Sequence, residues 1–221
     1  MHVVVNAAMS ADGKLSSRRR EQLAISGLED FERVDALRAA SDGVVVGVGT
    51  VLADDPSLTV KSADRRESRR QRGLSPNPAR IVADSRARTP ADAAILDGEA
   101  TTYLLVSDAA PVERRAALAD RGAELITAGD DRVDLLRAFA ALQADGLERL
   151  VVEGGGELIF SLFDVGLVDE LSVYVGPTVL GGRDAPTLAD GDGFVEAFPR
   201  LSLDGVEELD DGVLLRWQIA D

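Results

Sequence analysis

The sequence predicts an α/β protein built on a mainly parallel sheet, and three observations support this. Apolar, strand-like runs alternate with amphipathic, helix-like runs along the 221 residues. The run Gly43–Val48 is apolar throughout, as is typical of a strand covered on both faces. The last two runs flank Asp210-Asp211-Gly212, which favours an antiparallel hairpin. We therefore expect a mixed, mostly parallel sheet flanked by helices, with a C-terminal antiparallel hairpin, in a single domain spanning residues 1–221.

The individual elements follow from periodicity and local signals. The predicted strands are His2–Ala8, Gly43–Val48, Ala79–Ala83, Thr101–Val106, Glu124–Thr127, Glu148–Val152, Glu170–Val175, Ser202–Leu209 and Gly212–Ile219. Three helices are predicted at Pro111–Ala119, Asp131–Gln143 and Gly155–Phe163.

A further helix and an Arg-rich segment complete the chain. Ser26 and Glu29 are interpreted as a capping box that opens a helix to about Ala40. This helix would place Phe31, Val34 and Leu37 on one face. The segment 64–72 carries five Arg and is flanked by Ser, Gly, Asn and Pro, so it is predicted to be a loop. A solvated insertion is the favoured interpretation and an anion-binding loop the alternative.

Composition excludes several classes of site. The chain has no cysteine and a single histidine, His2. A disulfide framework, a thiolate nucleophile, a Cys-ligated metal and a buried Ser–His–Asp triad are therefore excluded, and no metal is expected. No apolar run is long enough to span a membrane, and the N-terminus lacks a signal-peptide pattern. We therefore expect a cytoplasmic protein.

The charge is strongly negative, with 24 Lys and Arg against 39 Asp and Glu and a net charge of −15. This argues against nucleic acid or anionic membrane as a partner. Lys14 and Lys61 are the only lysines, and all other basic residues are Arg. Many acids with almost no Lys indicate a surface adapted to a high-salt cytoplasm, because salt screens self-repulsion. A GC-rich genome is the alternative explanation.

Two glycine-rich segments follow predicted strands, at the sheet edge where ligands of α/β proteins bind. In Gly47-Val-Gly49-Thr50, Thr50 is placed to cap a short helix whose free N–H groups attract phosphate. A plain strand–helix turn is the alternative. The second segment is Glu153 followed by Gly154–Gly156, a candidate phosphate cradle without the Lys of an ATP-binding loop. Glu153 is either an acceptor for an amine or amide ligand or a brace of the loop.

Lys14 follows the first predicted strand, directly after an Asp12-Gly13 turn. An ammonium group at a strand end is a functional candidate, because its pKa is tuned readily by its surroundings. A solvated turn lysine is the alternative.

Six segments in this order resemble the riboflavin-biosynthesis reductases: NAAMSADGK, ISGLEDFERVDALRA, VGVGTVLADDPSLTVK, NPARIVADS, VVEGGGELI and DELSVYVGPTVLGG. The resemblance implies a dihydrofolate-reductase-like fold, a homodimer and NADPH as cofactor. The chain begins at the first reductase strand and has no Cys for a deaminase zinc. We therefore expect the stand-alone archaeal and fungal type, which reduces 2,5-diamino-6-ribosylamino-4(3H)-pyrimidinone 5′-phosphate to the ribitylamino product.

The resemblance also implies roles for individual residues. Lys14 and Glu153 would form a polar pair beside the ribose and pyrimidine. Lys14 would bond the ribose hydroxyls or assist proton transfer, and Glu153 would orient the substrate. The implied cofactor-binding residues are Ala8, Thr50, Asp54, Ser85, Gly154, Gly155, Gly156 and Glu157. The implied substrate-binding residues are Gln22, Arg38, Leu58, Lys61 and Glu153. Arg38 and Lys61 suit a 5′-phosphate, although Lys61 stands where most relatives have Arg.

Two other functions stay open. One is another dihydrofolate-reductase-like reductase, acting on a pterin or on the deaminated pyrimidine. The other is a non-catalytic NADPH-binding module. Arg86 or Arg88 is a candidate for the 2′-phosphate of NADPH, with a solvated loop as the alternative. Glu170–Val175 is a candidate dimer seam, although a covered strand has the same pattern.

Overall fold

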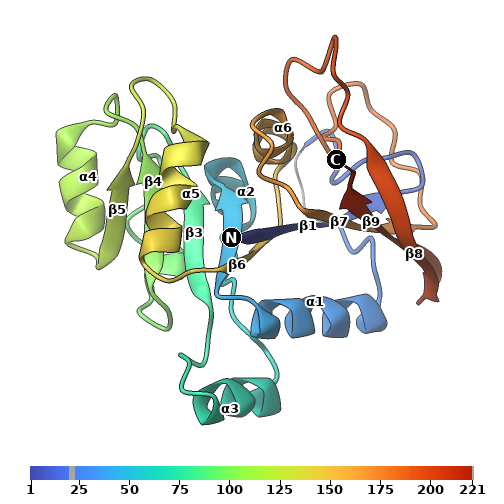
Figure 1. Cartoon of the computed structure of the whole chain (residues 1–221), viewed down its shortest axis with the longest axis horizontal. Helices are drawn as coiled ribbons and strands as arrows, with labels where there is room; N and C mark the ends of the chain where they lie inside the picture. The colour runs from blue at the N-terminus through green and yellow to red at the C-terminus, as the bar shows by residue number, and fades with distance from the viewer. Residues whose placement is uncertain (20–22, 221) are drawn as a thin grey trace. The chain divides into compact units, whose positions relative to one another are not determined.

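The computed structural model of this protein describes residues 1–19 and 23–220 (Figure 1). Its helices are α1 Leu28–Ala40, α2 Val48–Asp54, α3 Ala63–Gln71, α4 Val112–Ala119, α5 Leu135–Ala144 and α6 Gly156–Asp164, with a 3₁₀ turn at Ala94–Leu96. Its strands are β1 His2–Ser10, β2 Gly43–Gly47, β3 Ala79–Ala83, β4 Thr102–Val106, β5 Ala123–Thr127, β6 Arg149–Val152, β7 Glu170–Gly176, β8 Leu201–Leu209 and β9 Gly212–Ile219.

The chain divides into two compact units. Unit 1 contains residues 35–151 together with Met1, and unit 2 contains residues 2–34 and 152–221. Unit 2 is therefore assembled from the two ends of the chain, and the boundary at residue 35 falls within α1.

Unit 1 is a parallel α/β layer with strand order β5-β4-β3-β2-β6. The pairs β2–β3, β3–β4 and β4–β5 are all parallel. Val44, Val46 and Val82 belong to a cluster of buried apolar residues that α2, the 3₁₀ turn and α4 complete with Val51, Ile95 and Leu118. The burial of β2 explains why its segment is a continuous apolar run.

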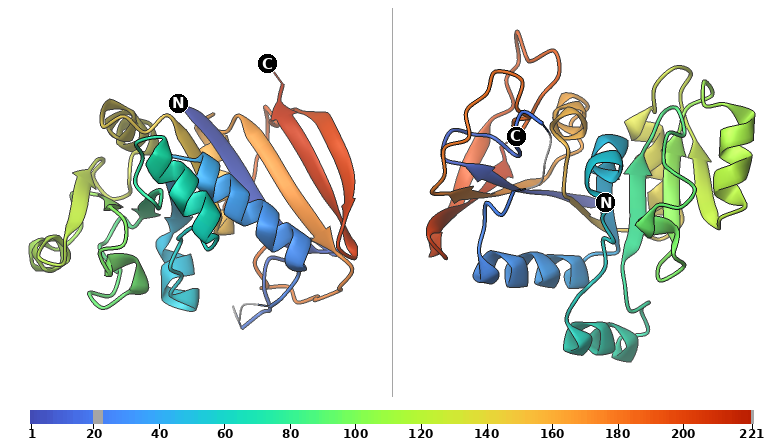
Figure 2. Two further views of the ribbon diagram at one scale, coloured as in Figure 1. Left: turned by 90° about the horizontal axis from the view of Figure 1, so that it is seen from below. Right: turned by 180° about the vertical axis from the view of Figure 1, so that it is seen from behind.

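Unit 2 holds four strands in the order β1-β7-β9-β8, which lie side by side (Figure 2). β1 and β7 are parallel, whereas β7–β9 and β9–β8 are antiparallel. The predicted mixed, mostly parallel α/β fold with a C-terminal antiparallel hairpin is therefore confirmed. Each predicted strand matches an observed strand to within two residues at either end.

The predicted capping box of α1 is wrong. The helix begins at Leu28, and its first turn is capped from the β8–β9 hairpin. The Asp210 carboxylate accepts the backbone N–H groups of Gly27, Glu29 and Asp30 at 3.1, 3.0 and 3.0 Å. Asp210 supplies through tertiary structure what a local Ser would supply at the N-cap.

The buried face of α1 in unit 2 is ionic rather than apolar. Phe31 is 56 % exposed, whereas Asp30 is buried. Arg33 donates to Asp30 at 2.7 Å and to Asn6 of β1 at 2.7 Å. Periodicity of apolar residues therefore located this helix correctly but did not identify all of its buried contacts.

The predicted Arg-rich loop is also wrong, because residues 63–71 form helix α3. Ser62 caps the helix by accepting the N–H of Arg65, and the last turn carries Arg69 and Arg70, which suit the negative end of the helix dipole. Arg69 is only 4 % exposed. It donates at 2.8 Å to the carbonyls of Ala39, Ser41 and Ser75. The missing apolar anchor is replaced by a buried guanidinium.

Within the part of the chain that the structure describes, no helix is long and apolar enough to cross a membrane.

Candidate functional site

The triglycine loop of unit 2 leads from the end of β6 into α6. Gly154 has φ of +128°, and the Gly154–Gly155 peptide bond is cis. In the described residues no side chain caps the N-terminus of α6, whose N-cap is Gly155. A Cβ on Gly156 would lie 2.5 Å from Asp190 Oδ2 and from the Thr187 carbonyl. The loop therefore needs glycine for close packing, and backbone N–H groups at a helix N-terminus without a side-chain cap suit an anionic ligand.

Lys14 lies in a tight turn after β1, also in unit 2. Its N–H donates to Ser10 Oγ at 3.0 Å, and its Nζ donates to the carbonyl of Ala185 at 3.3 Å. It forms an isolated antiparallel bridge with Thr187. The ammonium group is thus half-buried and held by a backbone acceptor, unlike that of a solvated turn lysine.

The other candidates of unit 2 lie close to these two features in the chain. Glu153 is half-buried and directly precedes the triglycine loop. Glu157 is exposed in the first turn of α6. Ala8 is half-buried in β1, where it is in register with Tyr174 of β7.

Thr50 and Asp54 belong to helix α2 of unit 1. The prediction that Thr50 caps this helix is wrong, because the helix already begins at Val48 and its N-cap is Gly47. Thr50 lies in the first turn and is partly exposed. A Cβ on Gly49 would have no heavy atom within 4 Å. Asp54 ends the helix, and partial desolvation raises its pKa above the usual value.

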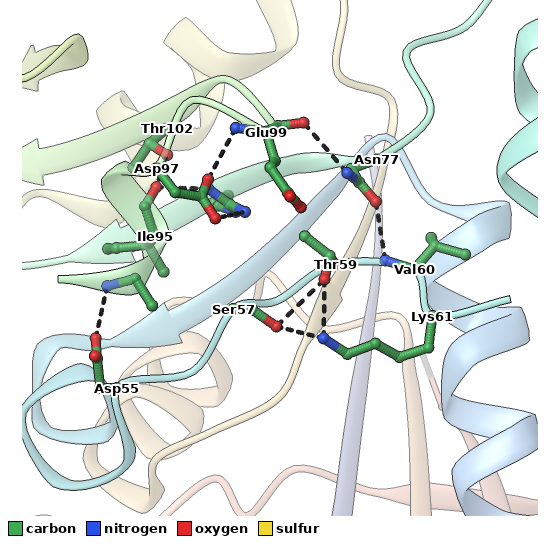
Figure 3. A network of polar contacts seen from close by, with 12 residues as sticks. Asp55, Ser57, Thr59, Val60, Lys61, Asn77, Ile95, Asp97, Glu99 and Thr102 are labelled. Carbon is green, nitrogen blue, oxygen red and sulfur yellow. Dashed lines mark hydrogen bonds and ion pairs between the residues drawn. The ribbon is translucent and has the colours of Figure 1, made fainter. Parts of the chain in front are cut away.

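Lys61 lies at the end of the extended segment that follows α2, which Figure 3 shows from close by. Its Nζ donates to Ser57 Oγ at 2.6 Å and to Thr59 Oγ1 at 3.0 Å. The Val60 N–H donates to Asn77 Oδ1 at 3.1 Å, which fixes the segment to the chain before β3. Leu58 has φ of +50° and is buried in the apolar cluster of unit 1. Only the backbone of Leu58 is therefore placed to reach a ligand.

One carboxylate and three arginines surround the backbone at Lys61. Arg38 of α1 donates to the Thr59 carbonyl at 3.1 Å, and Arg66 of α3 donates to the Val60 carbonyl at 2.7 Å. Asp35 accepts the N–H groups of Lys61 and Ser62 and the Arg65 guanidinium. Burial raises the pKa of Asp35, but these donors outweigh it and leave the pKa below its usual value. The result is a cluster rich in cations, with Ser57 and Thr59 hydroxyls beside it, which suits an anionic group.

Ser85 lies after β3, and its side chain is engaged within unit 1. Its Oγ accepts the N–H of Val133 at 3.1 Å, and its carbonyl accepts the Ser107 hydroxyl at 2.7 Å. Arg86 forms an exposed ion pair with Asp131 at 3.3 Å, and Arg88 is exposed.

The structure brings together two groups of predicted residues. In unit 1, Arg38, Leu58 and Lys61 meet around one backbone segment. In unit 2, Lys14 and Gly156 both contact Thr187. Gln22 lies outside the described residues. Among the described residues, no cluster of three or more His, Cys, Asp or Glu is placed to hold a metal ion.

Sequence reasoning missed Asp35, Arg65 and Arg66 in unit 1. Asp35 lies three residues before Arg38, so their shared helix face was a usable signal. Arg65 and Arg66 were noted only as charges in a loop. Their positions depend on α3, whose formation rests on the buried contacts of Arg69.

Comparisons with known proteins match almost the whole chain. The model of the family described as RibD C-terminal domain matches residues 1–215. A relative from Archaeoglobus fulgidus is 48 % identical over 211 residues, covering 96 % of this chain and 94 % of the relative. That protein is named 2,5-diamino-6-ribosylamino-4(3H)-pyrimidinone 5′-phosphate reductase.

Two solved structures support the fold. A pyrimidine reductase-like protein from Corynebacterium diphtheriae has a TM-score of 0.86 at 20 % identity, covering 100 % of this chain and 92 % of that one. Dihydrofolate reductase from Enterococcus faecalis, solved with NADP(H), has a TM-score of 0.51 at 14 % identity, covering 100 % and 97 %. The predicted dihydrofolate-reductase-like fold is therefore confirmed.

Proposed function

Because this chain belongs to the RibD C-terminal domain family, we propose that it reduces 2,5-diamino-6-ribosylamino-4(3H)-pyrimidinone 5′-phosphate to the ribitylamino product in riboflavin biosynthesis. The observation that carries this proposal is the match to two reductases of this name, from Archaeoglobus fulgidus and Methanothermobacter thermautotrophicus, at 48 % and 45 % identity over at least 90 % of each chain. We also propose that the two units act as one reductase domain, since the family match spans both.

We propose NADPH as the reductant, which supplies a hydride to C1′ of the sugar when bound. The residues present fit such a cofactor. The uncapped N-terminus of α6 follows a loop in which a Cβ would have no room at Gly156. Backbone N–H groups there suit a pyrophosphate. We assign cofactor binding to Gly154–Glu157 and Ala8, and to Thr50, Asp54 and Ser85. The Ser85 side chain already accepts the Val133 N–H, so its contribution is expected from its remaining polar atoms.

The substrate's phosphate is assigned to the cation cluster of unit 1. Arg38 and Lys61 supply the charge, and the Ser57 and Thr59 hydroxyls hold Lys61 Nζ in place. Leu58 contributes through its backbone. Gln22 remains a proposed contact on the strength of the resemblance alone.

The reacting sugar and the pyrimidine are assigned to Lys14 and Glu153. Hydride transfer to C1′ requires alignment more than a covalent protein group. Lys14 Nζ is a donor held near its place by the Ala185 carbonyl, which suits bonding to the ribose hydroxyls or delivery of a proton. Glu153 can accept hydrogen bonds from the amino groups of the pyrimidine and so orient it.

The test is an assay of NADPH oxidation with purified protein, in which the loss of near-ultraviolet absorbance monitors the reaction. The ribosylaminopyrimidine phosphate, its deaminated analogue and dihydrofolate are assayed in parallel. Turnover of the first alone supports the proposal. Preference for either other compound would instead favour the corresponding reductase. NADPH binding without turnover of any compound would favour a non-catalytic module.

We further propose that the protein is a homodimer that uses the outer face of β8 and β9. The suggested seam at Glu170–Val175 is not supported, because β7 lies between β1 and β9 and is largely buried. The apolar side chains of Leu201, Leu203 and Val206 on the edge strand β8 are 40, 59 and 60 % exposed. Across the sheet they pair with Ile219, Trp217 and Leu215, so the exposed apolar face is continuous.

Light scattering after gel filtration tests the dimer, with Leu203→Glu against the control Glu196→Gln. We expect the wild type and the control to have the mass of two chains and Leu203→Glu that of one. Trp217 is the only tryptophan, so its emission should also change on dissociation. A wild-type protein that stays monomeric at high micromolar concentration would contradict the dimer.

A further inference from the structure

Asp12 is given no part in the proposed chemistry, yet its carboxylate is fully engaged. Ser10 Oγ donates to Asp12 Oδ1 at 2.6 Å. The N–H groups of Leu180 and Gly181 donate to Oδ1 and Oδ2 at 3.0 and 2.7 Å. The Ser10 hydroxyl and these two N–H groups lower the pKa of Asp12 to about 2. Asp12 is therefore a charged anchor that ties the turn after β1 to a segment far along the chain.

That segment, residues 178–190, has little regular structure and runs past Lys14. At its start the Ala11 N–H donates to the Thr178 carbonyl at 2.8 Å. Further along, Lys14 forms a bridge with Thr187, and the Leu15 N–H donates to the Pro186 carbonyl at 2.9 Å. The acceptor of the Lys14 ammonium, the Ala185 carbonyl, belongs to the same segment. The position of Lys14 therefore depends on how this segment is held.

The far end of residues 178–190 packs on the triglycine loop. The Asp190 N–H donates to the Gly156 carbonyl at 3.1 Å. Asp190 Oδ1 accepts the Thr187 hydroxyl at 2.6 Å, which closes a compact turn. The absent Cβ of Gly156 is what allows Asp190 and the Thr187 carbonyl to approach this closely. A single segment therefore contacts both the Lys14 turn and the loop assigned to the cofactor.

We propose that Asp12 is a positioning residue: by anchoring residues 178–190, it fixes the Lys14 ammonium relative to the triglycine loop. This inference rests on the proposed function, which assigns Lys14 to the sugar and the loop to the cofactor. Lysine has a long, flexible side chain. A fixed acceptor restricts its conformations beforehand, so Lys14 loses less conformational entropy when it takes up its reactive position. Two backbone N–H bonds to one carboxylate are strong because the acceptor is charged.

The variant that tests this is Asp12→Asn, which keeps the size of the side chain and removes its charge. An amide presents one acceptor oxygen in place of two. The matched control is Asp184→Asn, in the same segment, whose exposed carboxylate accepts no hydrogen bond from the described residues. Both variants change net charge equally, so general electrostatic effects cancel.

Amide hydrogen exchange measured by mass spectrometry gives a readout that needs no activity. We expect Asp12→Asn to speed exchange about tenfold or more in peptides covering residues 11–16 and 178–187. Exchange in β7, residues 170–176, should stay as in the wild type, and the control should change neither region. Unchanged exchange in residues 11–16 and 178–187 would overturn the proposal.

Steady-state kinetics give the second readout. We expect Asp12→Asn to lower kcat about tenfold or more while the KM values for NADPH and substrate change less than about threefold. The midpoint of thermal unfolding should stay within a few degrees of the wild type. Faster exchange with an unchanged kcat would overturn the positioning role. A wild-type enzyme without turnover would instead contradict the proposed function. Hydrogen exchange alone would then show whether Asp12 anchors residues 178–190.

Discussion

Acidic residues that accept backbone N–H groups organise this molecule at the scale of single residues. Asp35, Asp12 and Asp210 each hold two or three backbone or side-chain donors from segments far away in the chain. All three lie in segments that the sequence singles out, but each finds its donors only after the fold is complete, so its role as an acceptor has no local signal. Lys14, Glu153 and Lys61 were identified from residue type, strand-end position and family resemblance, which do not depend on distant donors.

Lys61 is the residue whose role in substrate affinity is most directly testable. Lys61→Ala should raise the KM for the substrate roughly 10- to 100-fold, because one charge-assisted bond to the phosphate is lost. kcat should change little, and Lys61→Arg should restore most of the affinity. The control is Arg72→Ala, which removes one exposed positive charge from the end of α3. Equal effects of Lys61→Ala and Arg72→Ala would mean that only net charge matters.

The lowered pKa of Asp35 predicts a specific pH dependence of the free energy of unfolding. Its pKa is lowered in the folded state by the N–H groups of Lys61 and Ser62 and by Arg65, despite burial. Its stabilising effect is therefore fully present above the unfolded pKa, near 3.8, and is lost as pH falls through the lower folded value. We expect urea unfolding to give a higher free energy of unfolding for the wild type than for Asp35→Asn at pH 7. This difference in free energy should narrow below about pH 4. A constant difference down to pH 3 would contradict this assignment.

At the scale of elements, local signals located strands well but missed helix α3 and misassigned the cap of α1. The uninterrupted apolar run of β2 is determined by its own residues, and its bounds were predicted to within one residue. The α3 segment has the composition of a solvated loop, and its helix depends on Arg69 reaching carbonyls after α1 and before β3. The cap of α1 comes from Asp210, at the other end of the chain. Such long-range partners leave no local pattern in sequence.

Arg69 should therefore contribute most of the free energy that holds α3 in place. Arg69→Ala leaves the Ala39, Ser41 and Ser75 carbonyls without this donor, and we expect it to lower the free energy of unfolding by about 3 kcal/mol or more. Arg70→Ala removes an exposed ion pair with Glu67 and should cost less than about 0.5 kcal/mol. Urea denaturation measures both. A loss for Arg69→Ala as small as that for Arg70→Ala would show that α3 is held in another way.

At the scale of the whole molecule, the net charge of −15 opposes folding by self-repulsion. A surface adapted to high salt predicts a thermal midpoint that keeps rising above 1 M KCl. Ordinary screening is nearly complete by then, since the Debye length at 1 M is about 3 Å. Thermal unfolding measured from 0.1 to 3 M KCl distinguishes adaptation to high salt from the alternative, the base composition of a GC-rich genome. A midpoint that levels off below about 0.5 M would favour the compositional explanation.

The division of unit 2 between the two ends of the chain has a consequence for synthesis on the ribosome. Residues 35–151 emerge as a continuous stretch and can form unit 1 early. β1 emerges before them, but its partner β7 and the hairpin that caps α1 emerge last. At about 5 to 20 residues per second, β1 waits roughly 10 to 30 seconds for its partner. During that interval Val3, Val4 and Val5, buried in the finished protein, stay exposed, so the nascent chain is then most in need of a chaperone.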